Sequence, residues 1–208
     1  MKSSGLLPWP TPEELTAEQR EFYDTVVASP RAAARPTPLT DDDGRLYGPF
    51  NAMLTNPPVG DAIQAVGIAL RFSGTLPRPV FEALVLMVAV KRHASYEWYA
   101  HAPIALRRGM TEQQLAAIHQ HRWLETDGLL SPDVVRLACD TLAHVQPSED
   151  VVRGVEKEFG AAGVTEIVVT LTNYDAIATL MRTWDAQLPE GVEDPLDPAP
   201  TVVGRDTP

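Results

Sequence analysis

The sequence predicts an all-α protein of about eight helices in a single domain. Apolar residues recur at helical spacing in most segments, Ser, Thr and Pro stand where those segments begin, and strand-like alternation is almost absent. At 208 residues the chain can build one domain with a substantial core. We divide it into an N-terminal extension of residues 1–11, a helical domain of residues 12–188 with a long loop at 30–45, and a Pro-rich tail of residues 189–208.

Four helices are predicted in the first half of the domain. Thr11 and Pro12 begin the first, because Thr is a good N-cap and Pro is tolerated in the first turn. Gly74 ends the third. The fourth is apolar nearly all round, so we expect it to be buried on most sides. The predicted ranges are 12–29, 46–54, 59–72 and 80–90.

Five more helices follow, two of them opened by the capping residues Ser131 and Ser148. The last is ambiguous, since the run from Ile167 to Leu171 has a strand-like composition. Its apolar residues nevertheless keep a 3.6-residue period as far as Met181, which is much longer than a strand, so we predict a helix. The predicted ranges are 95–108, 115–121 with a cap at 111–114, 132–145, 149–159 and 164–188.

The amino-acid composition argues against two classes of binding partner, nucleic acids and membranes. Asp and Glu number 28 against 17 Lys and Arg, which gives a formal net charge of −11. An acidic chain repels phosphate backbones, so we expect no nucleic-acid partner. No apolar run is long enough for a membrane span, and the N-terminus lacks the apolar segment of a signal peptide. We therefore expect no membrane contact and a cytoplasmic location.

The only cysteine, Cys139, excludes an intrachain disulfide and a dithiol redox cycle. It lies in an apolar, helical run, which favours a small buried residue over a reactive thiol.

Polar residues gather on one line in the stretch that follows the apolar helix. At about 100° per residue, positions 93, 97, 101, 104 and 108 fall on a single stripe of the helix. That stripe reads His93, Glu97, His101, Ile104 and Arg108, and aromatic residues flank it. An ordinary surface helix gathers its apolar residues on one stripe instead. We interpret the line as the wall of a site; the alternative is a solvated charged face.

A second carboxylate, Glu82, stands on the apolar helix, where a charged group needs a partner or a purpose. Alternatively, Glu82 is a carboxylate in the first turn of its helix, where the helix dipole alone favours a negative charge. The alternative interpretation of Glu97 is that it only forms a surface ion pair with Arg92 or His101. We expect no metal, because His93 and His101 would lie about 12 Å apart along one straight helix.

Four segments in this order resemble the carboxymuconolactone decarboxylase family, whose other branch contains the alkylhydroperoxidase D-like proteins. The resemblance covers about residues 12–190. It implies an alkylhydroperoxidase D-like helical bundle, a homotrimer or homohexamer, and a pocket near a subunit interface. The segments are Gly48–Leu54, the helix of Glu82, Tyr96–His101 and Glu166–Tyr174.

The resemblance also indicates which branch to expect. In the peroxidase branch a Glu relays protons to a Cys-x-x-Cys motif, and a His follows the second Cys by four residues. Glu82 and His101 match the Glu and the His, whereas Ala94 and Glu97 occupy the two Cys positions. The chain is therefore similar to the thiol-less, decarboxylase-like branch, in which a carboxylate and a histidine handle protons.

The residues themselves indicate acid–base chemistry. Glu97 and His101 are four residues apart on one helix face, and an unperturbed His titrates near pH ~6.5. We predict His101 as proton donor or shuttle, Glu97 as its orienting partner and Glu82 as second carboxylate, with no cofactor. The predicted substrate-binding residues are Tyr96, Tyr99 and Arg108.

The predicted function is a cofactor-independent decarboxylase, or a related lyase or isomerase, acting on a small unsaturated carboxylate or lactone. Two alternatives stay open. One is a peroxidase-like antioxidant protein without the dithiol, and the other is a non-catalytic oligomeric binding protein on the same scaffold.

Overall fold

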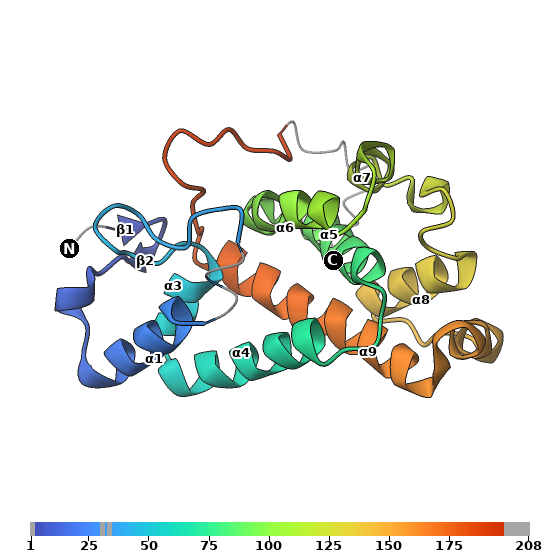
Figure 1. Ribbon diagram of the computed structural model, residues 1–208, viewed down its shortest axis with the longest axis horizontal. Coiled ribbons are helices and arrows are strands. Elements are labelled where there is room, and N and C mark those ends of the chain that lie inside the picture. Colours follow the sequence, from blue (N-terminus) through green and yellow to red (C-terminus); the bar gives the residue numbers. More distant parts are fainter. Residues whose placement is uncertain (1–2, 30–31, 33–34, 198–208) are drawn as a thin grey trace, which may run out of the picture.

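The computed structural model describes residues 3–29, 32 and 35–197, and helices dominate it (Figure 1). Helix accounts for 64% of the structure, and strands are almost absent, so the all-α class is confirmed. The eight α-helices of the described residues are α1 (Ala17–Val27), α3 (Pro49–Leu54), α4 (Pro57–Phe72), α5 (Arg78–Arg92), α6 (Ser95–Arg107), α7 (Glu112–His119), α8 (Pro132–Leu142) and α9 (Glu149–Thr183). Short elements complete the fold: the 3₁₀ turns η1 (Pro12–Glu14) and η2 (Trp123–Glu125), and the antiparallel strands β1 (Ser3–Ser4) and β2 (Leu7–Pro8).

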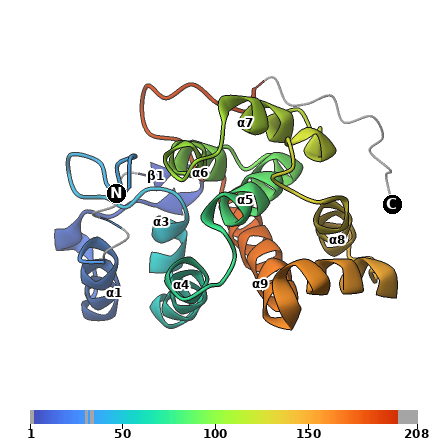
Figure 2. The same cartoon turned by 45° about the vertical axis from the view of Figure 1, so that its right-hand side comes forward.

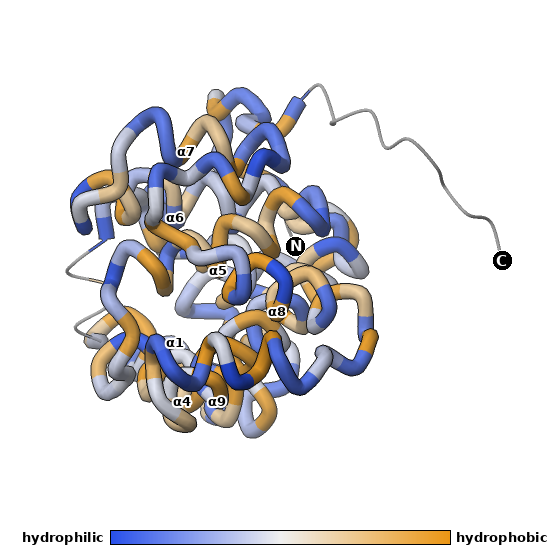
Figure 3. The backbone as a smooth tube through the Cα atoms, turned by 90° about the vertical axis from the view of Figure 1, so that its right-hand side faces the viewer, coloured by the Kyte–Doolittle hydropathy of each residue, from blue (hydrophilic) through white to orange (hydrophobic). Residues whose placement is uncertain are grey.

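Helix α5 is the centre of the core. It packs against α6, α7 and α9, and Figure 2 shows it with α6 to one side and α9 below. Its residues from Ala83 to Ala89 are completely buried, which confirms that this helix is covered on most sides. Figure 3 shows apolar and polar stretches alternating along the outer helices, as expected where only one face is buried. Within the described residues, no helix is both long and apolar enough to cross a membrane.

Two predicted helix starts are wrong. Thr11 caps only η1, because Leu15 is extended at φ −75° and ψ 143°, and Thr16 then caps α1 through a reciprocal pair of hydrogen bonds with Gln19. Pro57 was expected to lie before the next helix and instead forms the first turn of α4. Proline is tolerated there because the first N–H groups of a helix have no intrahelical acceptor.

The break between the last two predicted helices is confirmed at Gly160. Gly160 lies inside α9 with φ 71° and ψ 172°, a backbone conformation that residues other than glycine rarely adopt. Beyond it, the strand-like run from Ile167 to Leu171 is helical, as its period predicted. The chain therefore turns at Gly160, and the second part of α9 presents its apolar face to α5.

The first and last segments of the described residues pack against the rest of the protein. Trp9 is 9% exposed, and its Nε1 donates to the Leu46 carbonyl at 2.7 Å. At the other end Leu196 is buried, and His119 Nε2 donates to the Pro195 carbonyl at 3.0 Å. Residues 189–197, in the predicted Pro-rich tail, pack on their own chain because Leu196 supplies an apolar anchor. Residues 198–208 lie outside the described part, and the domain boundaries stay a prediction.

Candidate acid–base site

Three protonatable side chains meet between α5 and α6. Glu82 comes from α5, Glu97 and His101 come from α6, and each is no more than 4% exposed. His101 Nδ1 lies 2.7 Å from Glu82 Oε2, and its Nε2 lies 3.4 Å from Glu97 Oε2. The imidazole therefore has a carboxylate near each ring nitrogen. The structure brings the three residues together, and their catalytic roles remain predictions.

A tight turn aligns the two helices. His93 ends α5 in the left-handed conformation, with φ 51° and ψ 48°, and the Ala94 N–H donates to the Ala89 carbonyl at 2.8 Å. Helix α6 then starts at Ser95. The expected place of His93 on the polar stripe is therefore wrong, because a left-handed residue interrupts the helical repeat. Only Glu97, His101 and the residues after them follow the stripe.

An arginine completes the site. Arg71, in the last turn of α4, places one terminal guanidinium nitrogen 2.7 Å from His101 Nε2. Its Nε and the same terminal nitrogen donate to the Tyr174 hydroxyl of α9 at 3.1 and 2.9 Å. Guanidinium nitrogens only donate, so His101 Nε2 is the acceptor and Nδ1–H donates to Glu82. His101 is thus a neutral imidazole that carries its proton on Nδ1.

The surroundings of Glu82 and Arg71 shift the pKa of each side chain in the direction that favours its charged form. Burial by itself raises the pKa of Glu82, but the hydrogen bond from His101 and the positive charges of Arg71 and Arg108 lower it below its ordinary value. Burial lowers the pKa of Arg71, yet Tyr174, Glu82 and Glu97 together raise it. Glu82 therefore stays ionised at neutral pH and Arg71 stays charged.

His101 lines a cavity of about 40 Å³. This volume holds a few water molecules, and it is smaller than the pockets that bind drug-sized ligands. Apolar, polar and charged side chains all contribute to its wall. The residues that form the wall include Phe50, Met53, Ile63, Ile177, Arg35, Arg71, Tyr96, Glu97, His101 and Tyr174.

The three predicted substrate-binding residues lie in different places. Tyr96 borders the His101 cavity, and burial raises its pKa to about 12, so it stays a phenol. Arg108 is exposed at the end of α6 and borders a second hollow of about 60 Å³, which Glu82 also lines. Tyr99 lines neither hollow; its ring packs against that of Tyr96 with centroids 6.0 Å apart.

Arg71 and Tyr174 were missed by the sequence reasoning. Tyr174 belongs to a segment that carries the family resemblance, but no role was assigned to it. Arg71 had a readable signal, because it stands at the end of a largely apolar helical run, as Glu82 does. The sequence does not show the long-range packing that brings the Arg71 side chain of α4 to His101 of α6.

Within the described residues, no group of three His, Cys, Asp or Glu side chains is arranged to hold a metal ion. Comparison with known proteins finds no matching family model and no matching curated protein.

Proposed function

We propose that this protein is a cofactor-independent acid–base enzyme of the carboxymuconolactone decarboxylase family, with an alkylhydroperoxidase D-like bundle. Its reaction is the decarboxylation, or a related lyase or isomerase reaction, of a small unsaturated carboxylate or lactone. The observation that carries the proposal is that His101 is held between two carboxylates and lines a small cavity together with Arg71.

The orientation of His101 suits proton transfer through Nε2. In the proposed reaction, loss of the substrate carboxylate as CO₂ leaves an electron pair on a conjugated carbon, as a dienolate. The guanidinium of Arg71 lies where it can stabilise this negative charge. A proton from His101 Nε2 then completes the product, and the ring returns to the neutral form with its proton on Nδ1. Water supplies the proton for the next cycle.

The two carboxylates have different parts in this cycle. Glu82 accepts from Nδ1 throughout and stabilises the imidazolium that must precede protonation of the carbon. Glu97 lies 3.4 Å from Nε2, where it can accept from that nitrogen once it is protonated. Arg71 must move away from Nε2 for this to happen, while its two hydrogen bonds to Tyr174 keep it at the cavity.

The test is product analysis in D₂O. Purified protein is incubated with 4-carboxymuconolactone and a panel of β,γ-unsaturated acids, and CO₂ and products are followed by mass spectrometry and NMR. The proposal predicts CO₂ release with one deuterium on the carbon that becomes protonated, or double-bond migration with the same label. Absence of both reactions across the panel would reject the proposed activity.

One alternative has a specific observation in its favour. Both ring nitrogens of His101 have protein partners and the cavity is small, as a non-catalytic binding protein on this scaffold would show. That alternative predicts ligand binding without turnover in the same experiment. The peroxidase-like alternative is weaker: Cys139 lies on α8, and its burial raises the thiol pKa, which reduces the reactive thiolate.

We also propose that the protein is a homotrimer or homohexamer. The support is a set of exposed apolar side chains on α4, where Val59 and Val66 lie on one flank of the helix and Ile68 and Phe72 on the other, 38–57% exposed. Phe72 also borders the hollow next to Glu82, so a subunit that covers Phe72 would lie close to the site. The cytoplasmic location stays a prediction from the sequence.

A further inference from the structure

Arg35 brings a positive charge to the His101 cavity from the connection between α1 and α3. One of its terminal nitrogens donates to Thr37 Oγ1 at 3.2 Å and to the Tyr96 hydroxyl at 3.4 Å. Its guanidinium carbon lies 5.4 Å from the centre of the Phe50 ring. Its Nε is buried and has no acceptor among the described residues. These contacts are all with neutral groups, although carboxylates of the described residues line the same hollows as Arg35 without forming an ion pair with it.

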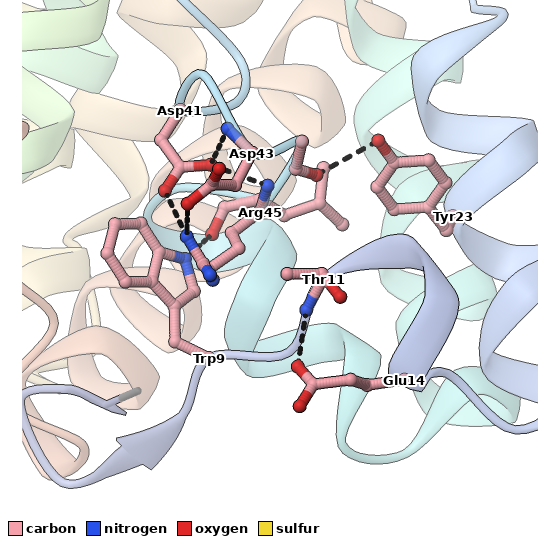
Figure 4. A network of polar contacts seen from close by, with 9 residues as sticks. Trp9, Thr11, Glu14, Tyr23, Asp41, Asp43 and Arg45 are labelled. Carbon is pink, nitrogen blue, oxygen red and sulfur yellow. Dashed lines mark hydrogen bonds and ion pairs between the residues drawn. The ribbon is translucent and has the colours of Figure 1, made fainter. Parts of the chain in front are cut away.

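Arg45, in the same connection between α1 and α3, is an arginine that does have carboxylate partners. It also lies over an aromatic ring, 5.6 Å from the centre of Trp9. However, it pairs with the carboxylate of Asp41 at 3.0 Å and with that of Asp43 (Figure 4). Within the described part of the chain, Arg35 makes no such ion pair. In a protein with 28 acidic residues, this difference marks Arg35 as a cation without its counter-ion.

The location of Arg35 indicates where that counter-ion belongs. Arg35 lines both the cavity that His101 borders and the hollow that Glu82 borders. It borders a third hollow as well, of about 50 Å³, next to Leu39. Arg71, the other arginine at the His101 cavity, is already engaged by Tyr174 and His101. Arg35 is therefore better placed to accept a new anionic partner.

We propose that Arg35 binds the carboxylate of the ligand and gives the site its preference for anionic over neutral molecules. A carboxylate suits this position, because a guanidinium offers two parallel N–H donors to its two oxygens. Arg35 then takes the anchoring role that the sequence analysis gave to Arg108. The inference rests on the proposed function for the identity of the ligand as substrate, but binding itself needs no turnover.

The test uses a matched pair of probes, crotonate and its neutral analogue crotonamide, in isothermal titration at low salt. Wild-type protein should bind crotonate at least about tenfold more tightly, the range of a charge-assisted hydrogen bond. Arg35→Gln should remove that preference and leave crotonamide binding unchanged, while Arg35→Lys should keep part of it. Arg107→Gln removes an exposed arginine that lines neither hollow and serves as the control.

Three results would overturn the inference. They are equal binding of the two probes by wild-type protein, a wild-type preference retained in Arg35→Gln, or a preference that is lost in Arg108→Gln instead. Thermal melting of each variant separates loss of binding from loss of folding, and Arg35→Lys keeps the test valid if Arg35→Gln fails to fold. Turnover that depends on His101, with an unchanged probe preference in Arg35→Gln, would reject this inference alone. Carboxylate binding through Arg35 without any turnover would reject the proposed function alone.

Discussion

His101 Nδ1 lies 2.7 Å from Oε2 of Glu82, and this contact joins the two helices that form the centre of the site. Each of these two side chains determines the protonation state of the other. The proton on Nδ1 leaves Nε2 as the nitrogen that accepts from Arg71, and the hydrogen bond helps to keep Glu82 ionised in spite of its burial. The predictions that follow depend on this pair and on the groups that surround it.

Glu82→Gln should lower turnover by roughly 100-fold or more, because an amide cannot stabilise the imidazolium that must form at His101. Steady-state kinetics on the substrate found in the D₂O experiment measure the loss. Glu112→Gln removes an exposed first-turn carboxylate of α7 and is the control. Equal turnover of the two variants would show that Glu82 has only a structural role.

Glu82 should also make the stability of the protein sensitive to acid. Its pKa is lower in the folded state than in the unfolded chain, so its contribution to stability is complete above the unfolded value, near pH ~4.3. That contribution is lost as the pH falls through the lower, folded value. Urea unfolding between pH 5 and about pH 3 should therefore show a smaller loss of stability in Glu82→Gln than in wild type. Parallel losses in both proteins would contradict the lowered pKa.

Tyr174→Phe should lower turnover by roughly tenfold and cost about 1 kcal/mol of stability. The hydroxyl accepts two hydrogen bonds from Arg71, and without it the guanidinium is no longer held beside His101. Tyr23→Phe is a matched control, since its hydroxyl donates to the Gly44 carbonyl outside the cavity. An effect on stability alone, equal in the two variants, would remove Arg71 from the proposed mechanism.

Gly48→Ala should destabilise the protein by about 2–4 kcal/mol and displace Tyr96 from the cavity wall. Gly48 has φ 58° and ψ −133°, and a Cβ atom there would lie 2.2 Å from the Tyr96 ring. Gly128→Ala isolates the backbone effect, because Gly128 has φ 75° but no atom within 4 Å of the added carbon. Denaturant unfolding of both variants measures the difference. Equal losses would mean that contact with Tyr96 is unimportant.

Phe72→Ser on the outer face of α4 should shift the protein towards monomers, measured by size-exclusion chromatography with light scattering. The substitution replaces an apolar contact of the proposed subunit interface with a hydroxyl. Leu124→Ser, on η2, removes a side chain of similar exposure from another surface and should leave the mass unchanged. A wild-type protein that is already monomeric would contradict the proposed oligomer.

The helices could be predicted from the sequence because local signals determine them. Ser131 and Ser148 cap α8 and α9 as expected, and Gly160 breaks α9 where the period changes. The errors occurred where two local signals compete, as with Thr11 and Thr16, which both suit an N-cap. His93 was misplaced because a left-handed residue other than Gly or Asn has no clear sequence signature.

Only part of the candidate site could be predicted. Glu97 and His101 belong to one helix turn, so their proximity follows from sequence spacing. The contact of His101 with Glu82 was suggested by the resemblance and by a carboxylate on an apolar helix. Arg71 and Arg35 come from segments far from α6 in the sequence, and long-range packing alone places them at the cavity.

Turnover of His101→Gln is the most direct test of the central claim, that His101 transfers the proton at the carbon of a small unsaturated acid. His144→Asn is the control, because His144 is exposed at φ 56°, a conformation that Asn tolerates. We predict that kcat/KM falls by about 100-fold or more in His101→Gln and is unchanged in His144→Asn. Wild-type turnover in His101→Gln would contradict the account.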